Sequence, residues 1–266
     1  MAVPEMDEGA QASYWNAISD MYREITRIDD QDFHYGPLLA GESELQLLPP
    51  LKAGMSSLEL GCGEGQNSRW LARQGLHCVA VDISEGQLAY ARKDAEAEGL
   101  EIDFRCASVE QFDPAGATFD LITSSHAFEF VAEPFEQVKR IAGWLKPGGT
   151  LMISTVHPVY NGEWVSAEEE DGSETWGRLL INYFRPIDDV REQPTGEGVP
   201  VISRAYPVSA WFNAFRAAGL VVERLEEPPA SETPAYASED WLEAMDECAA
   251  VPTTIIIVGR KPTVAS

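Results

Sequence analysis

A glycine-rich loop that follows an apolar segment is the part of this sequence that most clearly indicates chemistry. The segment Leu58–Gly65 reads LELGCGEG, and its glycines are Gly61, Gly63 and Gly65. Alternating glycines let a backbone turn sharply and approach a ligand closely. The spacing differs from the G-x-G-x-x-G of dinucleotide enzymes, where a pyrophosphate lies at a helix N-terminus. The acid before the loop, Glu59, suits a cofactor with a cationic amino group, although the loop alone leaves both kinds of cofactor open.

A second acid lies at the end of the next predicted strand. Asp82 directly follows the apolar segment His77–Val81. At this place a carboxylate can accept hydrogen bonds from both hydroxyls of a ribose. The alternative role, capping the following helix, can be filled by Ser84 with Gln87 as its capping-box partner. We therefore interpret Asp82 as a ribose-binding residue.

Four segments in this order resemble the motifs of class I S-adenosylmethionine (SAM)-dependent methyltransferases. They are Leu58–Gly65, Val79–Ser84, Phe119–Ile122 and Leu145–Gly149, and the similarity covers roughly residues 55 to 155. The resemblance implies an α/β fold with a Rossmann-like, seven-stranded sheet whose last strand is antiparallel. It also implies that SAM binds across the carboxyl ends of the first strands and leaves as S-adenosylhomocysteine.

The same resemblance assigns roles to single residues. The loop glycines would line the methionine part of SAM, and Glu59 would orient the loop and the amino group. Asp82 would hold the ribose, and Ile83 would pack on the adenine. Family members often use an Asp to hold the adenine amino group, but this chain has Ser108 near that position, so Ser108 or a backbone carbonyl would replace it. The predicted cofactor-binding residues are Glu59, Gly61, Cys62, Gly63, Gly65, Asn67, Asp82, Ile83, Ser108, Val109 and Ser124.

Histidines are the candidate bases. Methyl transfer depends mainly on positioning, and a base helps when the acceptor is a hydroxyl or an ammonium. His157 follows the fifth predicted strand, His126 follows the fourth, and His34 lies in an N-terminal segment that could cover SAM. We predict all three as catalytic candidates, although a lone histidine is more often structural.

Aromatic residues near the N-terminus and an arginine further on are candidates for contact with the methyl acceptor. Tyr14, Trp15 and Tyr22 recur at near-helical spacing, which is more often typical of a packing face than of a binding site. In similar methyltransferases an N-terminal helix closes over cofactor and substrate. We therefore predict a helical cover at residues 1–50 and the SAM-binding domain at residues 51–266. The predicted substrate residues are Tyr14, Tyr22, Tyr35, Ser125 and Arg178. For Arg178, the alternative is a surface ion pair with one of the nearby acids.

The elements that must position these residues alternate between strand-like and helix-like segments. This alternation is typical of a parallel sheet with crossover helices. Residues from about 157 to 206 interrupt it, which favours a lid or substrate insertion over a disordered loop, with an extra strand near residues 177–184. Strands are predicted at residues 57–60, 77–81, 101–105, 119–124, 150–155, 220–225 and 253–259, and helices at residues 68–74, 84–99, 135–145, 208–218 and 241–245.

The chain of 266 residues is strongly acidic, with 44 acidic and 19 basic residues and a formal net charge of −25. Such a surface repels phosphate backbones and anionic membranes, so neither is an expected partner, and the charge itself indicates solubility or a salt-rich cell. No apolar run approaches the ~18–20 residues of a membrane span, and the N-terminus lacks a signal-peptide pattern. We expect a cytoplasmic protein, monomeric or homodimeric. The scattered cysteines form no C-x-x-C pair, so no metal site is predicted.

The leading hypothesis is a SAM-dependent methyltransferase that modifies an O or N atom of a small metabolite. An NAD(P)-dependent oxidoreductase is the first alternative. Gln66 stands where its third glycine should be, and a Tyr-x-x-x-Lys pair is absent. A SAM-binding protein without catalytic turnover remains the second alternative.

Overall fold

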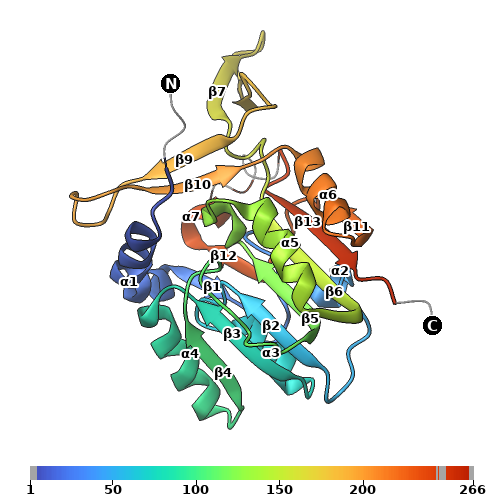
Figure 1. Ribbon diagram of the computed structural model, residues 1–266. Coiled ribbons are helices and arrows are strands. Elements are labelled where there is room, and N and C mark those ends of the chain that lie inside the picture. Colours follow the sequence, from blue (N-terminus) through green and yellow to red (C-terminus); the bar gives the residue numbers. More distant parts are fainter. Residues whose placement is uncertain (1–4, 244, 246–249, 264–266) are drawn as a thin grey trace.

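The computed structural model describes residues 5–243, 245 and 250–263, and a seven-stranded sheet runs through its centre (Figure 1). The strand order is β11-β13-β6-β5-β2-β3-β4. All strands are parallel except β13, which is antiparallel to both of its neighbours. This confirms the predicted sheet with its last strand antiparallel. The strands are β2 (Ser56–Leu60), β3 (His77–Asp82), β4 (Ile102–Cys106), β5 (Phe119–Ser125), β6 (Leu145–Val156), β11 (Val221–Glu226) and β13 (Thr254–Arg260).

Helices cover both faces of the sheet. Successive residues of a strand point to opposite faces, so a strand buried on both sides is apolar throughout. In β5, Ile122 packs with α5 and α6, whereas its neighbour Leu121 packs with Leu71 of α3 on the other face. The helices are α1 (Glu8–Ile25), α2 (Glu42–Leu45), α3 (Gln66–Arg73), α4 (Glu85–Ala97), α5 (Pro134–Trp144), α6 (Val208–Ala217) and α7 (Glu239–Glu243). None of the helices in the described ranges is long and apolar enough to cross a membrane.

The N-terminal region contributes more than the predicted helical cover. Helix α1 lies beside α4 (Figure 1), where Tyr90 donates to Asp20 over 2.7 Å. The next segment inserts into the core, and Phe33 is fully buried. Strand β1 (Thr26–Ile28) pairs with the distant strand β12 (Tyr236–Ser238), a pairing that the sequence did not indicate.

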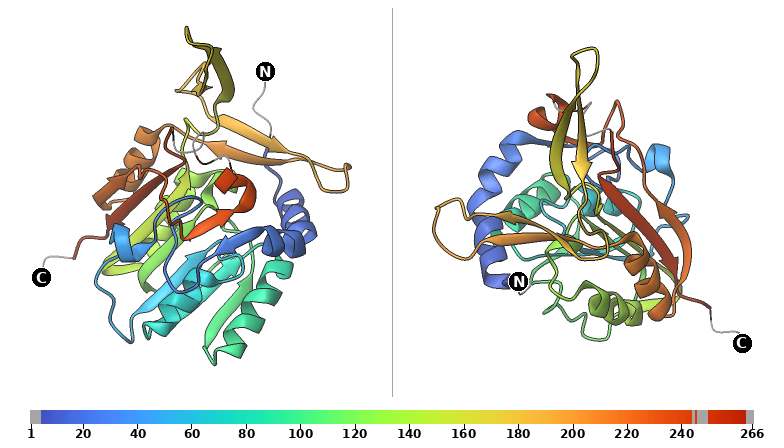
Figure 2. Two further views of the ribbon diagram at one scale, coloured as in Figure 1. Left: turned by 180° about the vertical axis from the view of Figure 1, so that it is seen from behind. Right: turned by 90° about the horizontal axis from the view of Figure 1, so that it is seen from above.

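The insertion after β6 is more regular than predicted. It forms two antiparallel hairpins, whereas the sequence analysis expected few clear elements. The β7–β8 hairpin projects from the body of the molecule (Figures 1 and 2). The predicted extra strand at residues 177–184 lies too late in the chain, because Ile181 and Phe184 follow β8 and are 84% exposed. The four strands are β7 (Glu163–Glu168), β8 (Glu174–Leu179), β9 (Ile187–Arg191) and β10 (Val201–Ala205).

The β9–β10 hairpin, unlike β7–β8, joins the body of the protein. Strand β10 is buried along its whole length. Gln193, which follows β9, donates a hydrogen bond of 2.9 Å to the carbonyl of Ala10 in α1. The insertion and the N-terminal helix therefore meet.

Candidate functional site

A cavity with about 950 Å³ of empty space, part of it open to solvent, lies at the carboxyl ends of β2 and β3. The chain enters the sheet at β2, adds β3 and β4 on one side, and then adds β5 and β6 on the other. The strand order therefore reverses beside β2, and open α/β sheets bind ligands at such a switch point. The two acids of the sequence motifs, Glu59 and Asp82, both line this cavity.

The glycine loop requires its glycines for two reasons. Gly61, Gly63 and Gly65 all have positive φ angles, of 73°, 54° and 73°. A Cβ atom on Gly61 would also lie 2.2 Å from the Cβ atom of Ala127. The loop is held over β3 because the N–H groups of Gly61 and Cys62 both donate to the carbonyl of Val81.

The carboxylate of Asp82 ties the loop to β3 and also faces the cavity. Its Oδ2 accepts from the N–H of Gly63 and its Oδ1 from the N–H of Ser84, each over 2.8 Å. The hydroxyl of Ser84 caps α4 by accepting from the N–H of Gln87, as predicted. The reciprocal half of the predicted capping box does not form, because the N–H of Ser84 donates to Asp82 and not to the side chain of Gln87. Burial raises the pKa of Asp82, and the donors Ser84 and Gly63 oppose that rise. A carboxylate oxygen has two lone pairs, so each oxygen can accept a further hydrogen bond from a ligand.

Glu59 is a buried carboxyl that forms no ion pair with any residue that the structure describes. It is 3% exposed and accepts a hydrogen bond from the hydroxyl of Ser68. Burial raises its pKa to about 8, against the opposing effect of Ser68. A cationic group in the cavity would favour the ionised carboxylate, because an opposite charge offsets the cost of burying it.

Orphaned polar atoms indicate that the cavity fits a polar ligand such as SAM. Gln87 Oε1, Glu64 Oε1 and His34 Nδ1 are buried and have no hydrogen-bond partner among the described residues. All three residues line the cavity. Buried polar atoms are normally paired, so these atoms suit a ligand that carries both donors and acceptors.

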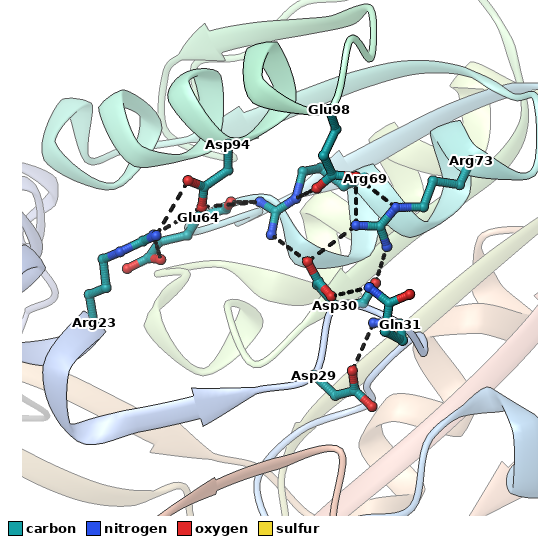
Figure 3. Close-up of polar contacts among 9 residues, drawn as sticks. All are labelled: Arg23, Asp29, Asp30, Gln31, Glu64, Arg69, Arg73, Asp94 and Glu98. Carbon is teal, nitrogen blue, oxygen red and sulfur yellow. Dashed lines mark hydrogen bonds and ion pairs between the residues drawn. The ribbon is translucent and has the colours of Figure 1, made fainter.

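A network of ion pairs holds the glycine loop, α1, α3 and α4 together (Figure 3). Arg23 of α1 pairs with Glu64 of the loop and, over 3.0 Å, with Asp94 of α4. Arg69 of α3 donates to the carbonyl of Glu64 over 2.8 Å and pairs with Glu98 over 2.9 Å. The side chain of Glu64 is thereby fixed at the cavity wall.

Most predicted cofactor residues line the cavity, and three do not. Gly65 is the N-cap residue of α3. Asn67 uses its side chain to bond the backbone N–H and carbonyl of His34, over 2.8 and 3.0 Å. Ser124 donates to the carbonyl of Leu60 over 2.7 Å. These three residues lie outside the cavity lining and support the site from behind, and their contact with the cofactor stays a prediction. The predicted residues that do line the cavity are Glu59, Gly61, Cys62, Gly63, Asp82, Ile83, Ser108 and Val109.

The structure separates the three candidate histidines. His34 and His126 line the cavity, whereas His157 does not. His157 is 3% exposed, its Nε2 lies 2.6 Å from Glu227, and its Nδ1 accepts from the N–H of Val159. Burial lowers its pKa, with Glu227 opposing. Both ring nitrogens are engaged away from the cavity, so the prediction of His157 as a base is corrected to a structural role.

His126 belongs to a buried polar cluster. Its Nδ1 lies 2.9 Å from Glu129 Oε1, and its Nε2 lies 2.9 Å from the hydroxyl of Thr254. Its φ angle is 54°, a left-handed conformation that is uncommon outside glycine and concentrated at functional sites. Burial alone would raise the pKa of Glu129, but His126 and the hydroxyl of Thr155 hold it below its ordinary value.

The predicted substrate residues are divided in the same way. Tyr22 and Ser125 line the cavity, and Arg178 lines a second cavity. Tyr35 is fully buried and donates to Glu42, and Tyr14 packs edge-on against Trp15 with ring centres 5.4 Å apart. Neither lines a described cavity. The prediction for Tyr35 is corrected to a packing role because the side chain is fully buried, and the substrate contact of Tyr14 stays a prediction.

The sequence analysis missed several lining residues. Trp15 and Phe130 form an aromatic wall, with ring centres 5.4 Å apart. Trp15 was recognised only as part of a packing face. Gln11 fixes this wall by donating to the carbonyl of Phe130 over 2.6 Å. Tyr236 reaches the cavity through the β1–β12 pairing, for which there was no local sequence signal.

The fold and the site together match those of class I SAM-dependent methyltransferases. Residues 58–153 match the family model described as "Methyltransferase domain". The matched range contains the glycine loop, Asp82, strands β3 to β5 and most of β2 and β6. The cofactor of this class is SAM.

Known proteins agree with this assignment. A SAM-dependent methyltransferase from Mesorhizobium loti is 25% identical in sequence, with a TM-score of 0.62 and coverage of 82% of this chain and 96% of that chain. A ubiquinone biosynthesis O-methyltransferase from Ruegeria pomeroyi is 40% identical over 105 residues, which are 40% of this chain and 42% of the relative. The corresponding protein from one strain of Cereibacter sphaeroides is 30% identical over 151 residues, 53% of this chain and 61% of the relative. The chain thus spans about half the length of the curated relatives that it matches.

Proposed function

We propose that this protein transfers a methyl group from SAM to an oxygen or nitrogen atom of a small molecule. The observation that carries the proposal is the cavity at the switch point of the sheet, in which the glycine loop, Asp82 and Glu59 come together. When bound, SAM supplies a methyl group activated by a positively charged sulfur.

Five of the residues that line the cavity have a role in binding SAM in this proposal. Asp82 accepts hydrogen bonds from the ribose hydroxyls through the free lone pairs of its two oxygens. Glu59 holds the cationic amino group. Ile83 and Val109 pack on the adenine, and Ser108 is placed to replace the usual acid at its edge.

His126 is the residue that we assign as the base for a hydroxyl acceptor. An ionised Glu129 only accepts hydrogen bonds, so it selects the tautomer in which Nδ1 of His126 carries the proton. Nε2 is then the basic nitrogen, and it accepts from the hydroxyl of Thr254, which the acceptor hydroxyl would have to replace. Glu129 stabilises the imidazolium formed when Nε2 takes up a proton. His34 is a poorer candidate because burial, together with the charge of His126, lowers its pKa to about 3.

Three observations support a small hydroxylated acceptor. The net charge of −25 disfavours a nucleic acid. The N-terminal helix contributes Trp15 and Tyr22 to the cavity wall, which suits an enclosed ligand. The curated relatives carry the name O-methyltransferase, which favours oxygen over nitrogen.

Calorimetry with S-adenosylhomocysteine and, separately, NAD tests the cofactor. We expect binding of the first and none of the second, and a loss of at least about tenfold in affinity in Asp82→Asn, about 1.4 kcal/mol. Asp103→Asn, a change of an exposed carboxylate on the neighbouring strand β4, is the control and should bind normally. Absence of binding, or unchanged affinity in Asp82→Asn, would contradict the proposal. Transfer of a labelled methyl group to hydroxylated acceptors would then exclude a SAM-binding protein without turnover.

A further inference from the structure

A second cavity, with about 960 Å³ of empty space, adjoins the first below the insertion. Residues from the insertion form much of its wall, including Asn161, Arg178 and Arg191. His126 lines both cavities, so the histidine assigned as the base stands between them. A ligand in the second cavity would therefore lie beside that histidine and leave the first cavity to the cofactor.

We propose that this second cavity binds the methyl acceptor, and that the acceptor is a small hydroxylated molecule with a carboxylate that Arg191 holds. The inference rests on the proposed function, since it places the second ligand of the same reaction. It adds the site and the chemical class of that ligand.

The hydrogen bonding of Arg191 points to a carboxylate. Its Nε donates to Asp189 over 2.9 Å, and its guanidinium carbon lies 5.7 Å from the ring centre of Phe130, which lines the first cavity. Its terminal nitrogens make no hydrogen bond to any described residue. A guanidinium has five N–H donors in a planar fork, and that fork binds a carboxylate through two parallel hydrogen bonds.

The local charge balance also permits an anion, although the whole molecule is strongly acidic. Of the three carboxylates that line the second cavity, two are paired with arginines and the third is hydrogen-bonded to a histidine. Asp188 forms two hydrogen bonds with Arg204, over 2.6 and 3.0 Å, Asp189 pairs with Arg191, and Glu129 bonds His126. The cavity wall carries a further guanidinium on Arg178, which stacks on Trp164 with 3.4 Å from its carbon to the ring centre. An incoming carboxylate therefore meets Arg191, whose Nε is used by Asp189, and Arg178, which also donates to the carbonyl of Gly162 over 2.9 Å.

Apolar surface in the second cavity favours a carboxylate on a carbon-rich molecule over a simple inorganic anion. Leu38, Val156 and Trp241 contribute this surface beside the charged groups. Ligand sites typically combine an apolar wall with a few polar groups that fix orientation. In this arrangement Arg191 would fix one end of the acceptor while its hydroxyl reaches His126.

The experiment compares a carboxylate with its neutral amide. The probes are 3,4-dihydroxybenzoate and 3,4-dihydroxybenzamide, and their binding to protein saturated with S-adenosylhomocysteine is followed by ligand-detected NMR and calorimetry. We expect the acid to bind about tenfold more tightly than the amide. Arg191→Gln should remove that difference by weakening the acid and leaving the amide unchanged.

Arg105 provides a closely matched control. It also lies on a strand, its Nε donates to the acid two residues earlier over 3.0 Å, and its guanidinium carbon lies 5.8 Å from a phenylalanine ring, but it lines neither cavity. Arg105→Gln should leave the binding of both probes unchanged.

The outcomes separate this inference from the proposed function. If S-adenosylhomocysteine binds normally but the acid fails to bind, binds no better than the amide, or is unaffected by Arg191→Gln, only the acceptor inference is wrong. If the wild-type protein does not bind S-adenosylhomocysteine, the proposed function fails and this inference fails with it.

Discussion

At the scale of single residues, neighbouring groups decide what a buried carboxyl can do. Glu59 and Glu129 are equally buried, at 3% exposure, but their pKa values shift in opposite directions. Beside Glu129 lie the imidazole of His126 and the hydroxyl of Thr155, which favour its ionised form. Beside Glu59 there is the hydroxyl of Ser68, so burial dominates. Glu129 is suited to stabilise a cation that forms nearby, and Glu59 to receive a cation that arrives with a ligand.

Cofactor binding should therefore release a proton from Glu59. Its pKa of about 8 means that the carboxyl is mostly protonated at pH 7, and a bound ammonium group favours the ionised form. The affinity for S-adenosylhomocysteine should rise with pH and level off near pH 8. Phosphate and Tris release different heats when they take up a proton. Calorimetry at pH 7 should therefore give binding heats that differ between the two buffers, and the difference should correspond to about 0.9 proton released, the protonated fraction of a group with a pKa of about 8.

Glu59→Gln should make the heat independent of the buffer, because no ionisable group remains at this position. Glu101→Gln, before β4 and outside the cavity, should behave like the wild type. A buffer-independent heat in the wild-type protein would show that Glu59 does not change its protonation on binding.

His126 should affect the rate and not the binding of the cofactor. His126→Asn keeps a residue that tolerates the left-handed conformation and removes the base, so kcat for a hydroxylated acceptor should fall by about 10²–10⁴. Glu129→Gln should cause a smaller fall and shift the acidic limb of the pH–rate profile. His157→Asn is the matched control, which should lower Tm but change kcat by less than about twofold. A rate loss in His157→Asn without one in His126→Asn would reverse the assignment.

At the scale of elements, the glycine loop is shaped by its contact with the segment after β5. Gly61→Ala should weaken cofactor binding by at least about tenfold, because the new Cβ atom meets Ala127 at 2.2 Å and the φ angle is 73°. Gly61→Ala/Ala127→Gly should recover part of the loss by removing the clash. Calorimetry and Tm measure both effects.

Gly116→Ala isolates the cost of the backbone conformation. Gly116 has a φ angle of 86° and nothing within 4 Å of an added Cβ atom, so its substitution should cost only about 1–2 kcal/mol of stability and no cofactor affinity. If the double variant binds no better than Gly61→Ala, steric conflict with Ala127 is not the cause.

The central elements were predictable from sequence because their signals are local. Strands β2 and β3 are short apolar segments that end at a glycine and an acid, and Ser84 marks the start of α4. Strands β7 and β8 lack such a signal, since they are largely exposed on both faces and show no alternation of polar and apolar residues. The β1–β12 pairing joins residues more than two hundred positions apart, and no local pattern encodes that register.

The same limit explains which site residues could be found. Glu59 and Asp82 were identified because each lies where a strand meets a loop. The distinction between His126 and His157 depended on Glu129, Thr254 and Glu227, which the fold brings to them. Both histidines follow strands of the same sheet, so only three-dimensional contacts could separate them.

At the scale of the whole molecule, two electrostatic effects on stability oppose each other: local ion pairs stabilise the fold, and the excess of acidic charge destabilises it. The network around Arg23 and Arg69 stabilises the contact of α1 with the glycine loop (Figure 3). It is set in a molecule with a net charge of −25, whose self-repulsion disfavours the compact state. Salt screens the repulsion between exposed carboxylates, but it screens ion pairs with buried members, such as Arg69 and Glu64, much less, so the loss of repulsion should dominate.

Potassium chloride should therefore raise Tm at neutral pH. An increase from 0.1 to 1 M shortens the Debye length from about 10 to about 3 Å, which removes most of the repulsion between separated carboxylates. Differential scanning calorimetry at pH 7.5 should show a rise of several degrees. At pH 4.5, close to the sequence pI of about 4.4, the net charge is small and the same salt should have little effect. A fall in Tm at pH 7.5 would contradict this prediction. It would mean that the ion pairs, including those between α1 and the glycine loop, stabilise the fold by more than the repulsion between excess acidic charges destabilises it.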